Sequence, residues 1–409
     1  MLDIITAKYI LNPTISNGKK HLELLTDYGI LYDDKIIMLK PFKDLVKEYP
    51  NAKINDYKNS LLTPALANTH THLEFSTNKS SLDYGSFTKW LKSINKNKAN
   101  LSKDARDNAI KMALLDIKKS GVGALGEISS FGLDFDALKD TKLKITLFHE
   151  ILGANENNFE NIKNGFLDRF NLAKNTLPSN ITHAASIHST YSLCKKVYDF
   201  ALDFIKQNNL SLSFHYLESL DEWEFISQNH GKLKEYLKVF NENIAPLNVD
   251  YLKDFEALHV IFIHCVFLKD FSALKPNHFI AHCPFSNRLL SENAFDLKKA
   301  LNDKANITLA TDGLSSNISL NIFDEARACI LTHHNLPFEI LLKEIFFAIT
   351  YTAHKALQTN SHSLEANLNA DFAVFDISDK EHDKGSILSE FLLHTRYAKD
   401  LFLNGKSVF

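Results

Sequence analysis

Short apolar runs alternate with longer stretches of helical periodicity through the middle of the chain. Such a run is typical of a buried strand, and the stretches between the runs place apolar residues at helical spacing. The segment LSKDARDNAIKMALLDIKKSG is the clearest of these stretches, and it ends at a glycine. The eight strand candidates span residues 60–70, 121–127, 143–150, 181–189, 210–218, 259–265, 277–284 and 306–313.

Eight strands, each followed by a helical pattern except the last, where that pattern is less clear, are what a TIM barrel requires. A doubly wound sheet would have fewer strands and usually a glycine-rich phosphate loop, which the sequence lacks. The pattern therefore predicts an α/β protein with a (β/α)8 barrel over residues 63–359.

Both ends of the chain have a different pattern, with short alternating segments and turn signals. Asn12-Pro13 and Asp33-Asp34 predict breaks between hairpin strands, and Asn404-Gly405 predicts a tight hairpin turn. We therefore expect residues 1–62 and 360–409 to form one composite β-sandwich domain beside the barrel.

Ionisable residues end most of the predicted barrel strands. Because the carboxyl ends of barrel strands meet at one face, these side chains are expected to converge on an active site. Repetition at the same position in so many strands indicates a site more strongly than any single histidine could. The residues are His70, His72, Glu127, Glu150, His188, His215, His264 and Asp312, and the remaining strand reaches His282.

Three histidines and one aspartate of this set are the predicted metal ligands. His70 and His72 are alternate residues of a strand end, so their imidazoles should point the same way. With His215 and Asp312 they offer three nitrogens and a carboxylate, which suits one Zn²⁺ or Fe²⁺ ion with a position left for water. A second ion would need a bridging ligand at the fourth strand end, where His188 stands instead.

Two further residues are candidates for moving protons. Glu218, three residues after His215, can carry a proton between the water and a substrate atom; the alternative is a helix-start carboxylate. His264 can hydrogen-bond the attacking hydroxide or a developing oxyanion, and the alternative is a supporting structural role. Asp312 is also counted as catalytic, as the acceptor of the hydroxide proton.

Composition and charge limit the classes of binding partner that we expect for the protein. A net charge of −3 gives no basic patch for nucleic acid or an anionic membrane. No run of about 18 apolar residues is present, and the N-terminus has no export signal, so we expect a cytoplasmic protein. Four widely spaced cysteines argue against a disulfide framework or a zinc–thiolate site. The oligomeric state stays open, with a homodimer as one option.

Five segments resemble the amidohydrolase superfamily, in its branch of cytosine deaminases and triazine hydrolases. The likeness covers nearly the whole chain, and the set is far more specific than His-x-His alone. The first segment is similar to the strand-one signature, and the last is similar to the return into the small sandwich. The segments are PALANTHTHLE, HYLE, AHCPFSNRLL, LATDGLSSN and SLEANLNADFAVFD.

The resemblance implies the same four metal ligands, proton transfer by Glu218, support of the nucleophile by His264 and contact of His188 with a substrate ribose. It also implies hydrolytic deamination of an adenine nucleoside modified at its 5′ position. Deaminases of S-adenosylhomocysteine, methylthioadenosine and guanine, and chlorohydrolases, belong to the same branch and remain alternatives. A non-catalytic scaffold of this fold is the alternative from another class.

Further substrate contacts are expected at four positions. Glu74 stands either against the substrate or against a ligand histidine. Glu150 ends the third strand, and Trp90, with Phe87 one helical turn before it, forms either a lid over the site or part of an outer helix. Arg288 stands either opposite a substrate carboxylate or on the surface. No role follows from the sequence for Glu127 or His282.

Overall fold

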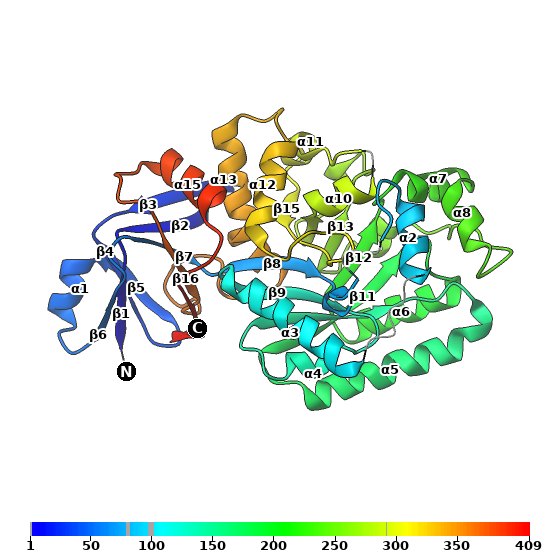
Figure 1. Ribbon diagram of the computed structural model, residues 1–409, viewed down its shortest axis with the longest axis horizontal. Helices are drawn as coiled ribbons and strands as arrows, with labels where there is room; N and C mark the ends of the chain where they lie inside the picture. The colour runs from blue at the N-terminus through cyan, green and yellow to red at the C-terminus, as the bar shows by residue number, and fades with distance from the viewer. Residues whose placement is uncertain (1, 79–81, 97–101, 292) are drawn as a thin grey trace.

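The computed structural model describes residues 2–78, 82–96, 102–291 and 293–409. Its centre is a sheet of eight parallel strands that follow one another in chain order. Helices surround this sheet, and the two ends of the chain form further sheets at one side (Figure 1). The predicted (β/α)8 barrel with additional β-structure from both termini is therefore confirmed.

The eight barrel strands correspond to the eight apolar runs. They are β8 (Leu66–Thr71), β9 (Val122–Ser129), β10 (Lys144–Ile151), β11 (Ile181–Ser189), β12 (Leu212–Tyr216), β13 (Val260–His264), β14 (His278–His282) and β15 (Asn306–Leu309). Nearly every residue in them is buried, as expected for parallel strands covered by helices.

The helices of the barrel follow its strands, β15 included. They are α2 (Phe87–Lys96), α3 (Lys103–Lys119), α4 (Phe135–Leu138), α5 (Phe159–Thr176), α6 (Lys195–Gln207), α7 (Leu220–Gln228), α8 (Lys232–Leu237), α9 (Tyr251–Asp254), α10 (Pro284–Leu290), α11 (Leu297–Asn302), α12 (Ile322–Thr332), α13 (Phe338–Ile349) and α14 (Tyr351–Ala356). None of the described helices is long and apolar enough to cross a membrane.

Helix α3 shows how the local sequence defines an element. Ser102 caps its first turn by accepting a hydrogen bond from the amide of Ala105. Ile110, Leu114 and Ile117, at helical spacing, are buried. Gly121, just beyond its end, has φ +85°, and a Cβ there would lie 2.6 Å from the Phe375 ring, so glycine is required. Gly121, which follows the end of α3, therefore allows the backbone to pack closely against Phe375, a residue near the other end of the chain.

The barrel closes between its first and last strands through side chains and one backbone bond. Thr69 and Thr308 share a hydrogen bond of 2.7 Å between their hydroxyls, and Asn68 donates to Thr311 over 2.8 Å. The amide of Asp312 donates to the carbonyl of His70 over 3.1 Å. Closure therefore brings two predicted metal ligands together.

Two sheets are built from the ends of the chain. One has the order β5-β4-β1-β6, and the other has the order β18-β17-β16-β7-β2-β3 and joins both ends of the chain. The elements are β1 (Asp3–Thr6), β2 (Tyr9–Ser16), β3 (Lys19–Leu25), β4 (Tyr28–Tyr32), β5 (Ile36–Pro41), β6 (Lys53–Asp56), β7 (Ser60–Pro64), β16 (Phe372–Asp376), β17 (Asp400–Leu403) and β18 (Lys406–Ser407), with helices α1 (Phe42–Glu48) and α15 (Lys384–His394).

Of the three turn signals in these ends, two form the expected hairpins. Asn404-Gly405, both at positive φ, joins the antiparallel strands β17 and β18, and Asp33-Asp34 separates β4 from β5. The break expected at Asn12-Pro13 was wrong, because β2 runs through it. Proline is tolerated there because β7 pairs with β2 only at Tyr9 and Ile10, so beyond Ile10 β2 has a single strand partner.

Candidate active site

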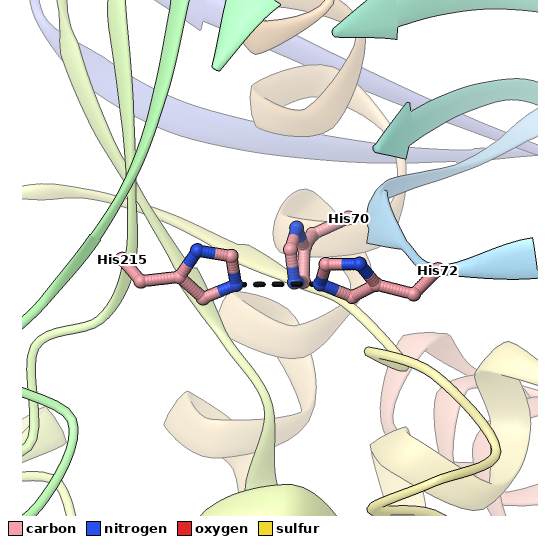
Figure 2. Close-up of side chains that lie close together, drawn as sticks. All are labelled: His70, His72 and His215. Atoms are coloured by element: carbon pink, nitrogen blue, oxygen red, sulfur yellow. Dashed lines mark hydrogen bonds between the residues drawn. The ribbon is translucent and has the colours of Figure 1, made fainter. Parts of the chain in front are cut away.

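Three histidines from two strands converge at the carboxyl end of the barrel. His70 lies in β8, His72 directly follows it, and His215 lies in β12 (Figure 2). The Nε2 atoms of His72 and His215 are 3.3 Å apart, and ligand nitrogens of all three lie within 4.8 Å of one another. Two nitrogens bound to one zinc ion at 2.0–2.1 Å in tetrahedral geometry would be roughly 3.3–3.4 Å apart. The observed spacing therefore matches a shared ion.

Asp312 brings a carboxylate to the same point from beyond the end of β15. Its Oδ1 lies 3.4 Å from His70 Nε2 and 3.6 Å from His72 Nε2. Asp312 holds a left-handed backbone conformation with φ 57°, which costs energy in a residue with a side chain. Such strain is concentrated at functional sites, where the surrounding structure maintains it.

The protonation states of these groups fit a metal ion. His70 is fully buried, and both of its ring nitrogens lack a hydrogen-bond partner among the described residues. Burial and the neighbouring His70 lower the pKa of His72 to about 3, and the same causes lower that of His215, so both offer lone pairs. Burial alone would raise the pKa of Asp312, but His70 and His72 bring it well below its ordinary value.

Hydrogen bonds fix the orientation of two of these four residues, His215 and Asp312. His215 donates from Nδ1 to the carbonyl of His188 over 2.8 Å, which leaves its Nε2 free for an ion. Asp312 Oδ2 accepts from the hydroxyls of Ser286 and Ser316, each at 2.7 Å. Such outer contacts hold metal ligands in a binding geometry before the ion arrives.

Glu127, whose role could not be inferred from the sequence, supports the strand end that carries the two histidines. Its carboxylate accepts from the amide of Leu73 over 2.8 Å and from the hydroxyl of Thr71 over 2.6 Å. The residue at 126 is glycine because a Cβ there would lie 2.2 Å from the carbonyl oxygen of Thr69. Strands β8 and β9 can therefore approach closely beside His70.

Glu218 and His264 lie beside the cluster. Glu218 is buried, and burial, followed by the charge of Asp312, raises its pKa well above the ordinary value, which favours its protonated form. His264 Nε2 lies 3.4 Å from Glu218 Oε1 and 3.9 Å from Asp312 Oδ2. Leu217 and His264 also hold left-handed conformations, with φ 51° and 68°.

A cavity of about 490 Å³ opens above these residues. Its floor is polar and its walls and mouth are apolar, which is typical of sites for small organic molecules. The lining residues are His72, Phe75, Trp90, Leu91, Ile94, Ser130, Phe131, Glu150, Leu152, Ala154, Asn155, His188, Tyr191, Ser192, His215, Glu218, Tyr236, Leu237, Phe240, His264, Asp312 and Ser315.

Three of the predicted substrate contacts line this cavity. Trp90 lies in α2 and donates from its indole nitrogen to the carbonyl of Ser315 over 2.8 Å. Glu150 accepts from the hydroxyl of Ser130 over 2.5 Å through Oε2, while its buried Oε1 has no hydrogen-bond partner among the described residues. His188 bonds Ser192 through Nδ1, so Nε2 is the nitrogen left for a ligand.

Two other predicted contacts do not reach the cavity. Glu74 is buried and accepts backbone N–H bonds from Ser130, Phe131 and Leu133, so it supports the loop after β9, and it is not among the described residues that line the cavity. Burial, with the charge of Asp134, raises the pKa of Glu74 to about 8.

Arg288 is exposed, because the buried face of α10 carries Ser286, Asn287 and Leu290 and position 288 points the other way. Phe87 packs in the apolar cluster with Tyr191 rather than lining the cavity. The structure therefore brings the strand-end residues together and places Arg288 on the surface, which was one of its two expected positions.

Several aromatic residues of the mouth were not found from the sequence. Phe131 and Phe240 are 62% and 55% exposed, which is unusual for large apolar side chains and indicates a binding surface. Tyr191 lies in the same segment as His188 and could have been noted there. Tyr236 lies in α8, far along the chain, and no local pattern marks it as part of this site.

Comparison with known proteins agrees with the site. Residues 61–408 match the model of the amidohydrolase family. An adenosine deaminase of Helicobacter pylori is 37% identical, over 94% of this chain and 96% of its own length. An aminodeoxyfutalosine deaminase of Nitratiruptor is 32% identical, over 94% and 95%. A crystal structure of H. pylori aminofutalosine deaminase in complex with methylthio-coformycin superimposes with a TM-score of 0.91 at 35% identity, covering all of both chains.

The protein belongs to the amidohydrolase family, whose members are metal-dependent, and its cluster of three histidines and an aspartate is the candidate metal centre. The relatives that it resembles over nearly their whole length are deaminases of adenine nucleosides by name.

Proposed function

We propose that this protein is a hydrolytic deaminase of a 5′-modified adenine nucleoside, and that its substrate is 6-aminodeoxyfutalosine. Its product would be futalosine, with ammonia released, on the futalosine route to menaquinone. The single observation that carries the proposal is the buried Glu218, which lies 3.4 Å from His264 at the floor of a nucleoside-sized cavity beside Asp312. A non-catalytic scaffold has no need to maintain such a group.

The ion that we assign to the centre is one divalent cation, Zn²⁺ or Fe²⁺, held by His70, His72, His215 and Asp312. Imidazole-rich sites accept both metals, so availability would decide between them. When bound, the ion would lower the pKa of a water and make hydroxide available near neutral pH.

The residues of the chain then divide the proton transfers. Glu218 gives its proton to the ring nitrogen next to the carbon that carries the amino group. Asp312 accepts a proton from the water that attacks this carbon, while His264 hydrogen-bonds the same water. Ammonia leaves from the tetrahedral intermediate with the proton that Asp312 returns, and the hydroxyl left on the carbon gives its proton to Glu218. One water is therefore consumed for each ammonia released, and Glu218 is protonated again.

Glu150 is our candidate for binding the ribose, with His188 beside it. A buried carboxylate oxygen without a partner favours a ligand that donates a hydrogen bond, and ribose hydroxyls are such donors. Neighbouring Ser130 holds the other oxygen in place. The site would therefore select a riboside over a free base.

Replacing Glu150 with glutamine should raise KM for ribosides. Hydrogen bonds to a charged group are worth about 1.5–3 kcal/mol, so kcat/KM should fall roughly 10- to 100-fold for 5′-methylthioadenosine. The 2′,3′-dideoxy form of the same nucleoside lacks both donors and should lose little. Equal losses for the two compounds in steady-state assays would contradict a ribose contact.

The mouth of the cavity is the part of the site where the 5′ substituent of the substrate would lie. Its apolar walls suit an aryl ketone, and no lysine or arginine is among the lining residues that the structure describes. The carboxylate of 6-aminodeoxyfutalosine would therefore extend to the rim. Lys92 is exposed there, with Nζ 5.7 Å from the centre of the Tyr236 ring, and we assign it this carboxylate.

A Lys92→Ala variant should raise KM for aminodeoxyfutalosine several-fold and leave that for methylthioadenosine, which has no carboxylate, unchanged. An exposed ion pair is worth about 1 kcal/mol at most, roughly fivefold, and the effect should shrink at high salt. Arg288→Ala is the matched control and should change neither KM. An effect of Arg288→Ala larger than that of Lys92→Ala would restore the sequence-based assignment.

The reaction class is tested by ammonia release from the purified protein. We expect release from adenine nucleosides and none from guanine, and no chloride from a chlorotriazine. A relative named adenosine deaminase makes adenosine the second candidate substrate. Guanine or triazine turnover above that of every adenine nucleoside would overturn the proposal.

A further inference from the structure

A chain of hydrogen bonds runs from His264 away from the cavity. His264 Nδ1 bonds Asn287 Oδ1 at 2.8 Å, and Asn287 Nδ2 bonds His282 Nδ1 at 3.2 Å. His282 Nε2 then bonds His333 Nε2 at 2.8 Å. All four residues are buried, and the proposed reaction uses only His264.

The far end of this chain has the composition of a metal site but the geometry of a hydrogen bond. His282, His333 and Cys329 place ligand atoms within 4.8 Å of one another. The two imidazole nitrogens are 2.8 Å apart, whereas those of His72 and His215 are 3.3 Å apart. Because a tetrahedral ion needs the longer spacing, the shorter one indicates a hydrogen between the two nitrogens.

The direction of each bond follows from the chemistry of the groups. An amide oxygen only accepts, an amide NH₂ only donates, and a neutral imidazole carries one N–H. Asn287 presents its oxygen to His264, so the hydrogen of His264 is on Nδ1. It presents its NH₂ to His282, whose own hydrogen is then on Nε2 and is donated to His333.

We propose that His333, through His282 and Asn287, holds His264 in the tautomer with hydrogen on Nδ1 and a bare Nε2 toward the attacking water. Turning the Asn287 amide over would reverse every bond and put a hydrogen on His264 Nε2. His264 would then donate to the water rather than accept from it. His333 is therefore a positioning residue, although it lies outside the cavity. The inference rests on the proposed function only in the identity of the water that His264 faces.

His333→Leu removes the acceptor at the far end and leaves the active-site residues in place. We expect kcat to fall roughly tenfold, as for other outer partners of a catalytic imidazole, with KM and metal content unchanged. His333→Gln offers an amide oxygen as the acceptor and should restore most of kcat. Cys329→Ala is the matched control, because Cys329 packs in the same cluster but is outside the chain of bonds; its kcat should equal that of the wild type.

The tautomer itself can be measured by ¹⁵N NMR of the histidine-labelled, zinc-loaded protein, with His264 assigned from a His264→Gln variant. Nδ1 of His264 should be the protonated nitrogen in the wild type and in Cys329→Ala, and this preference should weaken in His333→Leu. Protonation at Nε2 in the wild type would overturn the inference even if the protein proves to be the proposed deaminase. So would a normal kcat in His333→Leu, an equal loss in Cys329→Ala, or a second metal ion that Cys329→Ala removes.

Discussion

Replacing Glu218 with glutamine lowers kcat by roughly 10²- to 10⁴-fold, the usual contribution of a general acid or base. Glutamine keeps the shape of the side chain and can still donate a hydrogen bond, but it cannot give up a proton. Glu218 is not among the proposed ligands, so the metal content should stay at the wild-type value. Single-turnover kinetics with elemental analysis of the same sample checks both expectations.

The same variant separates catalysis from structure. Thermal unfolding should change little, because burial raises the pKa of Glu218 and so already favours a neutral side chain in the wild type. Near-normal turnover in Glu218→Gln would refute its role as the proton carrier. Loss of the metal together with turnover would instead make Glu218 a ligand.

Removing the ion should abolish turnover, and adding back Zn²⁺ or Fe²⁺ should restore it. Without the ion, a water with a pKa near 16 replaces one near 7 as the nucleophile, so a loss of roughly 10³-fold or more is expected. His72→Gln should reproduce this loss and bind less than the single ion of the wild type. Chelation, metal analysis and kcat measured on one preparation provide the test.

His149→Gln is the matched control for His72→Gln. His149 is also buried and lies in β10, two strands from β8, but it stacks on His183 and contacts Phe170 of α5 on the helical side of the barrel. This variant should keep its ion and its kcat, whatever it loses in stability. Two ions per chain in the wild type, or full activity without any, would contradict a mononuclear centre.

Much of the fold could be predicted because its signals are local. Each barrel strand is a short apolar run, and parallel strands covered on both faces must have that composition. Asn404-Gly405 likewise specifies its own turn. The strand break predicted at Asn12-Pro13 was wrong, because the effect of a proline on a strand depends on which edges of the strand are paired. For β2 this pairing depends on β7, which is far away in the sequence.

The strand-end residues of the site were accessible for a related reason. A parallel barrel brings the ends of all its strands to one face, so topology alone places His70 and His215 together. Side chains beyond the strand ends follow no such rule. Glu74 and Arg288 take their positions from local loop and helix geometry. Glu74 accepts hydrogen bonds from backbone amides, and Arg288 is exposed to solvent.

The residues of the cavity wall were still harder to predict from the sequence. Tyr236 and Phe240 reach the mouth from a segment between β12 and β13, and only the folded chain brings them opposite Trp90. The left-handed backbone at His264 and Asp312 is equally invisible in the sequence, since neither residue is a glycine. Substrate specificity depends on these features, which is why the reaction class could be inferred more readily than the substrate.

The proposed substrate is tested by comparing kcat/KM for 6-aminodeoxyfutalosine with the values for adenosine, methylthioadenosine and S-adenosylhomocysteine, under one set of conditions. We expect the highest value for 6-aminodeoxyfutalosine, because its aryl ketone would fill the apolar mouth and its carboxylate would reach Lys92. A tenfold preference for any of the other three, equivalent to about 1.4 kcal/mol of transition-state binding, would contradict the assignment.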